Sequence, residues 1–100
     1  MESLSALEHI DDTVHGRVRL GVLAYLSTAG SADFLTLLEI TKSTKGNLSS
    51  HISKLEAAGY VEKTFVDRTA RTTVTMTPSG EQAFADYLSI LRSILVQIPL

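Results

Sequence analysis

The chain contains no cysteine, and this absence removes two classes of protein from consideration. Without thiols there can be no disulfide framework of the kind that supports small secreted domains, and no thiolate metal site. Long apolar runs are missing too, since no stretch approaches the roughly 20 residues that cross a bilayer. Residues 1–12 carry acidic side chains where a signal peptide would be positively charged. The sequence therefore predicts a soluble, cytoplasmic protein without a membrane partner.

Repeats, low-complexity tracts and linkers rich in proline, glycine or serine are also absent from the sequence. One hundred residues with 44% hydrophobic content can form one core and are too few for two. We expect a single domain over residues 1–100, in which residues 1–12 form an N-terminal extension.

The net charge of -2 argues at first sight against a nucleic-acid partner, because phosphate binding needs cations. The distribution of charge reverses that argument. Residues 42–71 contain six cations and three anions, which gives +3, whereas the other residues together carry -5. An acidic body with one basic segment suits a protein that touches DNA with a single face.

Apolar residues recur at three- and four-residue spacing near the start of the chain, which predicts a helix over residues 13–30. Asp12 or Thr13 is expected to cap its first turn, and Gly30 is expected to end it. Residues 31–33 are interpreted as a short connection.

A two-turn helix is predicted over residues 34–41, with Asp33 as its N-cap, and residues 42–44 form the turn that follows. A third helix is predicted over residues 44–58, capped by Thr44 and closed by Gly59. Its apolar residues form one stripe toward the core, and its opposite face is small and polar. That outer face comprises Gly46, Asn47, Ser50, Ser53 and Lys54.

From Tyr60 the hydrophobic period changes to two. The stretches "YVEKTFV" and "RTTVTMT", separated by "DRTA", predict a β-hairpin with a basic tip over residues 60–77. Thr77 followed by Pro78 then predicts the start of a last helix over residues 78–98. The expected fold class is mainly α with a small β-hairpin (α+β), that is, a winged helix-turn-helix with a three-helix core, a wing and a C-terminal dimerisation helix.

The stretch "GNLSSHISKLEAAGYVEK", followed by "RTTVTMTPSGEQAF", resembles MarR/ArsR-like winged-helix transcriptional regulators. The leading "VHGRVRLGVLAYL" is similar to their first helix, so the resemblance covers about residues 13–88. It implies a homodimer that binds a pseudo-palindromic operator and usually represses. The sequence departs from the family pattern in the turn before the third helix, where "TKST" lacks the more usual glycine or alanine.

An exposed helix with donors and acceptors near its N-terminal half can read base edges in the major groove, and arginines at a hairpin tip suit the narrow minor groove. We expect base contacts from Asn47 and Ser50, and minor-groove contacts from Arg68 and Arg71. The competing interpretation is an ordinary solvated surface. The complete set of predicted DNA-binding residues is Lys42, Lys45, Asn47, Ser49, Ser50, His51, Lys54, Lys63, Arg68 and Arg71.

The last helix carries more apolar surface than packing on one side of a small domain requires, so part of it is assigned to a partner subunit. The alternative is that all of it belongs to the core. The predicted dimerisation residues are Leu4, Leu7, Phe84, Tyr87, Leu88, Leu91, Ile94, Leu95 and Ile98.

Other chemistry finds little support in the sequence. Asp11 and His15 have the spacing of a helical ligand pair, but two candidate ligands make a weak zinc site. Arg17 and Arg19 are expected to have structural roles, pairing with Asp11, Asp12 or Asp86. No catalytic constellation can be read from the spacing, so we expect no enzyme and no cofactor. A small-molecule effector is conceivable, and the rival function is a winged helix that binds another protein instead of DNA.

Overall fold

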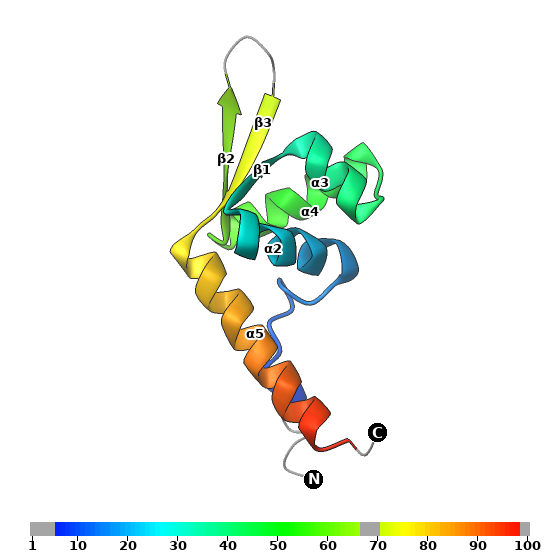
Figure 1. Ribbon diagram of the computed structural model, residues 1–100, viewed down its shortest axis with the longest axis vertical. Coiled ribbons are helices and arrows are strands. Elements are labelled where there is room, and N and C mark those ends of the chain that lie inside the picture. Colours follow the sequence, from blue (N-terminus) through cyan, green and yellow to red (C-terminus); the bar gives the residue numbers. More distant parts are fainter. Residues whose placement is uncertain (1–5, 67–70, 99–100) are drawn as a thin grey trace.

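The computed structural model describes residues 6–66 and 71–98, without the side chain of Val66. Figure 1 shows how its helices and strands are arranged. In chain order they are η1 (Ala6–His9), α2 (Arg17–Ala29), β1 (Ser31–Asp33), α3 (Phe34–Thr41), α4 (Lys45–Ala57), β2 (Val61–Val66), β3 (Arg71–Met76) and α5 (Pro78–Val96).

One hydrophobic core joins the helices to the sheet. Leu23 of α2, Leu37 of α3 and Leu55 of α4 are fully buried, as are Val61 and Val74 of the sheet. Apolar positions predicted from the helical and strand periods therefore point inward, as such stripes do. The predicted fold class, mainly helical with a small sheet in a winged-helix arrangement, is confirmed.

Side-chain caps fix the starts of three helices, as predicted for Asp33 and Thr44. Asp33 accepts from the backbone N–H of Thr36, and this bond is the first cause that lowers the pKa of its carboxyl group. Thr44 accepts from the N–H of Asn47 at the start of α4, and Thr77 accepts from the N–H of Gly80 at the start of α5. Each bond satisfies a backbone donor that has no partner within its helix.

The sheet contains a strand that the sequence did not indicate. Residues 31–33 form β1, which pairs antiparallel with β3 through Ala32↔Val74 and its neighbours, in the order β1-β3-β2. The interpretation of these residues as a plain connection is wrong. A three-residue strand shows no measurable alternation, and its pairing partner lies about forty residues away in the sequence.

The start of the first long helix was also placed too early. α2 begins at Arg17, with Gly16 as an N-cap that makes no side-chain bond, so the prediction of Asp12 or Thr13 as the cap is wrong. Asp11 instead accepts from the N–H of Thr13 and, through its carbonyl, from the N–H groups of Val14 and His15. Residues 11–16, which we call the strap, are therefore held as a turn.

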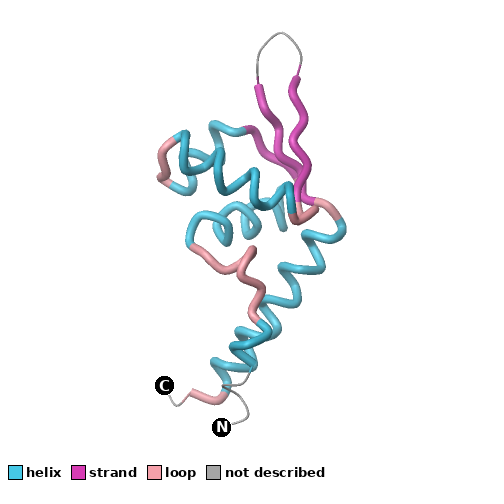
Figure 2. The backbone as a smooth tube through the Cα atoms, turned by 180° about the vertical axis from the view of Figure 1, so that it is seen from behind, coloured by secondary structure: helices cyan, strands magenta, loops and turns pink. Residues whose placement is uncertain are grey.

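The molecule is elongated, with extents of 55 × 25 × 21 Å. Figures 1 and 2 show the hairpin of β2 and β3 projecting at one end, while the C-terminal part of α5 lies at the other end beside η1. Among the helices of the described ranges, none combines the length and apolar character that a bilayer crossing needs.

Candidate nucleic-acid interface

The predicted outer face of α4 is open to solvent. α4 runs over Lys45–Ala57, one residue shorter at each end than expected, and it buries Leu48, Ile52 and Leu55 against the core. Every other residue of its first two turns except His51 is exposed. The predicted contacts Lys45, Asn47, Ser49, Ser50 and Lys54 all lie on this exposed surface.

His51 is placed differently from its neighbours on α4, because its ring is half-buried against α2. Arg19 Nη1 lies 2.9 Å from His51 Nδ1, so the ring accepts a hydrogen bond from the guanidinium. Burial lowers the pKa of His51, and the positive charges of Arg19, Lys54 and Arg17 lower it further. A neutral His51 ring therefore links α4 to α2.

Arg19 and Arg17 hold backbone carbonyl groups rather than carboxylates. Arg19 donates to the carbonyl oxygens of Thr13, Asp12 and His15, and so ties the strap to α2. Arg17 donates to the carbonyl of Thr41 at 2.7 Å, at the end of α3. Their structural role agrees with the sequence interpretation, but the expected ion pairs with Asp11, Asp12 and Asp86 are not among the described contacts.

The turn between α3 and α4 uses a left-handed residue that is not glycine. Lys42 has φ 50° and ψ 41°, and its side chain is exposed. Thr41, beside it, is buried and bonds through Oγ1 to the carbonyl of Leu37 and to Ser43. The turn therefore forms without a glycine, and Lys42 takes its left-handed position.

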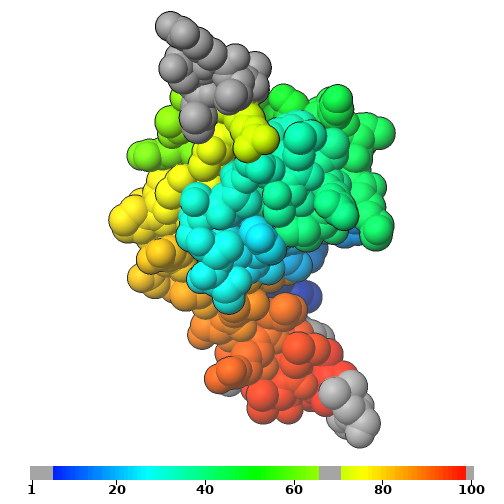
Figure 3. Space-filling view, turned by 45° about the horizontal axis from the view of Figure 1, so that its top comes forward, coloured from blue at the N-terminus to red at the C-terminus, as the bar shows by residue number. Residues whose placement is uncertain are grey.

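The hairpin stands next to α4. Lys63 Nζ lies 3.4 Å from Glu56 Oε1, and this ion pair connects β2 to α4. Lys63 is half-buried, whereas Arg71 is exposed at the start of β3. Arg68 lies in residues 67–70, outside the described residues. In Figure 3, which turns the hairpin end forward, the surface of α3 and α4 (green) lies beside the base of the hairpin.

The apolar residues predicted for dimerisation differ in how far they are exposed. Phe84 and Tyr87 belong to the chain's own core, and Ile94 is buried as well, with exposures of 8%, 3% and 6%. Assigning these three to a partner surface is wrong, because α5 turns that side toward α2 and η1. Leu91 is half-buried, and Leu4 lies outside the described residues. Leu7, Leu88, Leu95 and Ile98 are exposed.

The exposed side of α5 forms an open apolar groove. It encloses about 410 Å³ and is lined by Leu88, Leu91, Arg92, Leu95 and Val96. Val96, the most exposed large apolar residue of the described chain, was absent from the predicted set. Its position eight residues after Leu88, about two turns along the helix, could have indicated it.

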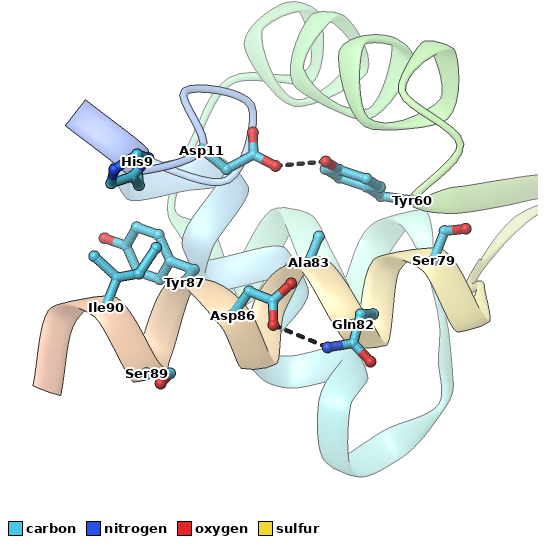
Figure 4. Close-up of a pocket in the computed structure, with 10 residues that line it drawn as sticks. All are labelled: His9, Asp11, Tyr60, Ser79, Gln82, Ala83, Asp86, Tyr87, Ser89 and Ile90. Carbon is cyan, nitrogen blue, oxygen red and sulfur yellow. Dashed lines mark hydrogen bonds between the residues drawn. The ribbon is translucent and has the colours of Figure 1, made fainter. Parts of the chain in front are cut away.

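A pocket of about 560 Å³ lies between α5 and a wall formed by His9, Asp11 and Tyr60 (Figure 4). Tyr60, the third residue after α4, donates a hydrogen bond to Asp11, and this bond raises the pKa of Tyr60 to about 12. On the opposite wall, Gln82 donates to Asp86 at 2.9 Å. His15 Nδ1 lies 3.1 Å from the Tyr87 hydroxyl. Sequence reasoning missed this cluster because its members come from three separate segments.

Metal binding has no support in the described part of the chain. Residues 6–66 and 71–98 contain no group of three or more histidine, cysteine, aspartate or glutamate side chains placed to share an ion. The pair formed by Asp11 and His15 does not build a site, since each side chain bonds to a tyrosine.

Residues 18–95 match the family described as winged helix DNA-binding domain. The chain belongs to this family. It is 36% identical over 73 residues to the uncharacterized protein MJ0432 of Methanocaldococcus jannaschii, which covers 71% of this chain and 79% of that protein. The solved structure of a transcriptional regulator homologue from Pyrococcus horikoshii OT3 aligns over 100% of both chains, with a TM-score of 0.87 and 32% identity.

A MarR-family transcriptional regulator from Silicibacter pomeroyi shares the fold, with a TM-score of 0.71 at 20% identity over 93% of this chain and 63% of that one. The winged-helix protein thus has the fold of DNA-binding transcriptional regulators, and the family is one of DNA-binding domains and not of enzymes.

Proposed function

We propose that this winged-helix protein is a homodimeric, sequence-specific repressor that binds a pseudo-palindromic operator in double-stranded DNA. The observation that carries the proposal is the exposed face of α4, which is small and polar and stands beside a basic hairpin. A face of this kind fits the major groove, which is about 12 Å wide and admits one helix.

The contacts divide by chemistry. Asn47 and Ser50 read base edges, because their side chains both donate and accept and lie free near the start of α4. The lysines that contact phosphates are Lys42, Lys45, Lys54 and Lys63. For the last of these, the ion pair with Glu56 is replaced by an ion pair with a DNA phosphate. Arg71, with Arg68, enters the minor groove, where the potential of the duplex is most negative.

His51 contributes to this function indirectly. Its Nδ1 is occupied by Arg19, so only the other edge of the ring is available to DNA. The contact joins α4 to α2 and thereby fixes the orientation of the recognition helix α4 relative to α2.

Two subunits pair through the exposed side of α5, with Leu88, Leu91, Leu95 and Ile98 of one copy against the same residues of the other. Leu7 of η1 extends this surface. Twofold pairing places two recognition helices on one side of a duplex, about 34 Å apart for successive major grooves. A dimer that occupies such a site excludes other proteins from the promoter. This exclusion is the simplest way for a DNA-binding domain to repress.

A binding titration tests the proposal. The protein is titrated onto a random duplex and onto fragments selected from random DNA, each at low and at moderate salt. Salt-sensitive binding to random duplex, with tighter binding to selected fragments, is expected. A winged helix that serves only as a protein-binding module predicts no salt-sensitive shift.

Two substitutions separate the proposed roles. Arg71→Ala should weaken binding to all sequences and lower the salt slope by about one, whereas Arg71→Lys, the matched control, should keep the slope. Asn47→Ala should change base preference, and Gln82→Ala, which removes an exposed amide on α5, should not. Parental binding by both Arg71→Ala and Asn47→Ala would refute the assigned contacts.

A further inference from the structure

Phe65 is an exposed aromatic residue on the wing that the contacts proposed above do not use. It lies on β2, where it pairs with Thr72 of β3, and 71% of its surface is accessible. The chain's three tyrosines and its other two phenylalanines are buried or half-buried. One exposed apolar side chain needs no explanation by itself, so the direction in which Phe65 points decides its meaning.

The strand alternation gives that direction. Successive side chains of a strand point to opposite faces, so Val61, Lys63 and Phe65 share one face of β2. Val61 is buried in the core, and Lys63 reaches Glu56 of α4. Phe65 therefore extends the face of β2 that is turned toward α4. Figure 2 shows that the hairpin of β2 and β3 projects beyond the helices.

The position of this face in a complex follows from the proposed docking, on which the inference rests. With α4 in a major groove and the hairpin tip in the neighbouring minor groove, one sugar-phosphate strand runs between them. The α4-facing side of β2 looks onto that strand. Lys63, two residues before Phe65 on the same face of β2, supplies the charge that draws the backbone to this position, whereas Arg71 pairs with Val66 and lies on the opposite face.

The chemistry of the ring selects the part of the backbone that it can contact. A phenyl ring neither donates nor accepts hydrogen bonds, so it gains nothing from phosphate oxygens, but deoxyribose presents an apolar C–H surface. We propose that Phe65 packs against the deoxyribose groups of the strand between the two grooves and acts as an apolar anchor for the wing.

An apolar anchor differs from the cationic contacts in its response to salt. The salt slope counts the phosphates that cations neutralise, and Phe65 neutralises none. Phe65→Ala should therefore weaken binding about tenfold, a loss expected from burying part of one phenyl ring, while the salt slope stays at the parental value. The loss should be equal on random and selected duplexes, since sugars carry no sequence information.

Two controls accompany this measurement. Phe65→Leu keeps most of the apolar surface and should lose less affinity than Phe65→Ala. Both variants should unfold at the parental temperature, because a side chain so exposed contributes little to the core. Parental affinity of Phe65→Ala, or a changed salt slope, overturns the inference.

A direct probe is available because the chain has no tryptophan. In Phe65→Trp the new ring is the single indole, and its quenching by acrylamide reports how much water reaches it. Saturation with duplex should reduce that quenching. Unchanged quenching overturns the inference, and protection that appears on raising the protein concentration without DNA would instead assign Phe65 to contact with a second copy.

The same experiments distinguish this inference from the proposed function. If the parent shows no salt-sensitive binding to any duplex, the proposed function fails, and this inference fails with it. If the parent binds and Phe65→Ala binds equally well, only the role of Phe65 is refuted.

Discussion

At the scale of single residues, Gly80 shows how closely α5 approaches the end of α4. A Cβ atom at Gly80 would lie 2.1 Å from the carbonyl oxygen of Tyr60, which is backbone and cannot move cheaply. The glycine of the "TPSG" motif is therefore required by packing. Gly80→Ala should lower the free energy of unfolding by about 1–3 kcal/mol, measured by urea denaturation.

Gly21→Ala is the matched control for this substitution. Its Cβ would meet only the Thr41 Cγ2 atom at 3.6 Å, an ordinary contact, in the interior of α2. Here alanine should raise the free energy of unfolding by about 1 kcal/mol, because glycine is the poorer helix former. Equal stability of Gly80→Ala and the parent would contradict the close approach.

Lys42 offers a second test at this scale. A left-handed conformation costs a residue with a Cβ about 1 kcal/mol relative to glycine, and Lys42 adopts it at φ 50°. Lys42→Gly should therefore raise the melting temperature while weakening DNA binding through the lost cation. Lys42→Asn, which tolerates the same conformation, should weaken DNA binding equally. A melting temperature of Lys42→Gly below that of the parent would refute the strain at this turn.

At the scale of elements, the sequence predicts what is coded locally. The limits of α4 could be predicted to within one residue, because a cap at Thr44, an apolar stripe and the left-handed Gly59 all lie within that segment. β1 could not be predicted, since three residues become a strand only through β3. Similarly, the position of His51 in the helical pattern of α4 predicts an exposed side chain. Its ring is half-buried because it bonds to Arg19 of α2, and the sequence of α4 does not contain that information.

The contact between α2 and α4 makes stability depend on pH through His51. In the folded protein burial, followed by Arg19, Lys54 and Arg17, lowers the pKa of this histidine below 6.5. The unfolded chain therefore takes up a proton at higher pH than the folded chain does. The contribution of His51 is complete above the unfolded pKa and is lost as the pH falls toward the folded pKa.

His51→Gln should reduce this loss, because glutamine can still accept from Arg19 but does not titrate. The measurement is the urea midpoint at about pH 7.5 and about pH 5.5, on either side of the ordinary histidine range. His9→Gln, at an exposed histidine of η1, should retain the parental difference between the two midpoints. An undiminished difference in His51→Gln would exclude the Arg19 contact as its source.

At the scale of the whole molecule, the two proposed interfaces lie at opposite ends of a body 55 Å long. The hairpin and α4, which we propose to bind DNA, lie toward one end, and the C-terminal part of α5, which we propose to pair with a second copy, lies at the other (Figure 1). The strap lies between them: its carbonyl groups accept from Arg19, which also bonds to His51 of α4, and its His15 bonds to the buried Tyr87 of α5. The spacing of the two recognition helices therefore depends on how α5 pairs and on how the strap holds it to the body.

The pairing itself can be tested at this scale with Leu88→Glu and Leu95→Glu. Each side chain is about half exposed, at 45% and 49%, so glutamate should leave the subunit folded. In a twofold interface every substitution places two carboxylates in the apolar contact, and analytical ultracentrifugation should show a monomer. Affinity for a two-half-site operator should then fall roughly tenfold or more, because the second recognition helix loses its effective concentration.

Leu35→Glu is the control for these variants, because Leu35 is 63% exposed on α3, away from α5. It should sediment as the parent does. A parental oligomeric state in Leu88→Glu and Leu95→Glu would remove α5 as the dimerisation surface. Loss of their helical circular dichroism would show instead that the two leucines support the fold of the single subunit. Because Phe84, Tyr87 and Ile94 already provide the buried contacts of α5, we expect the monomer to remain folded.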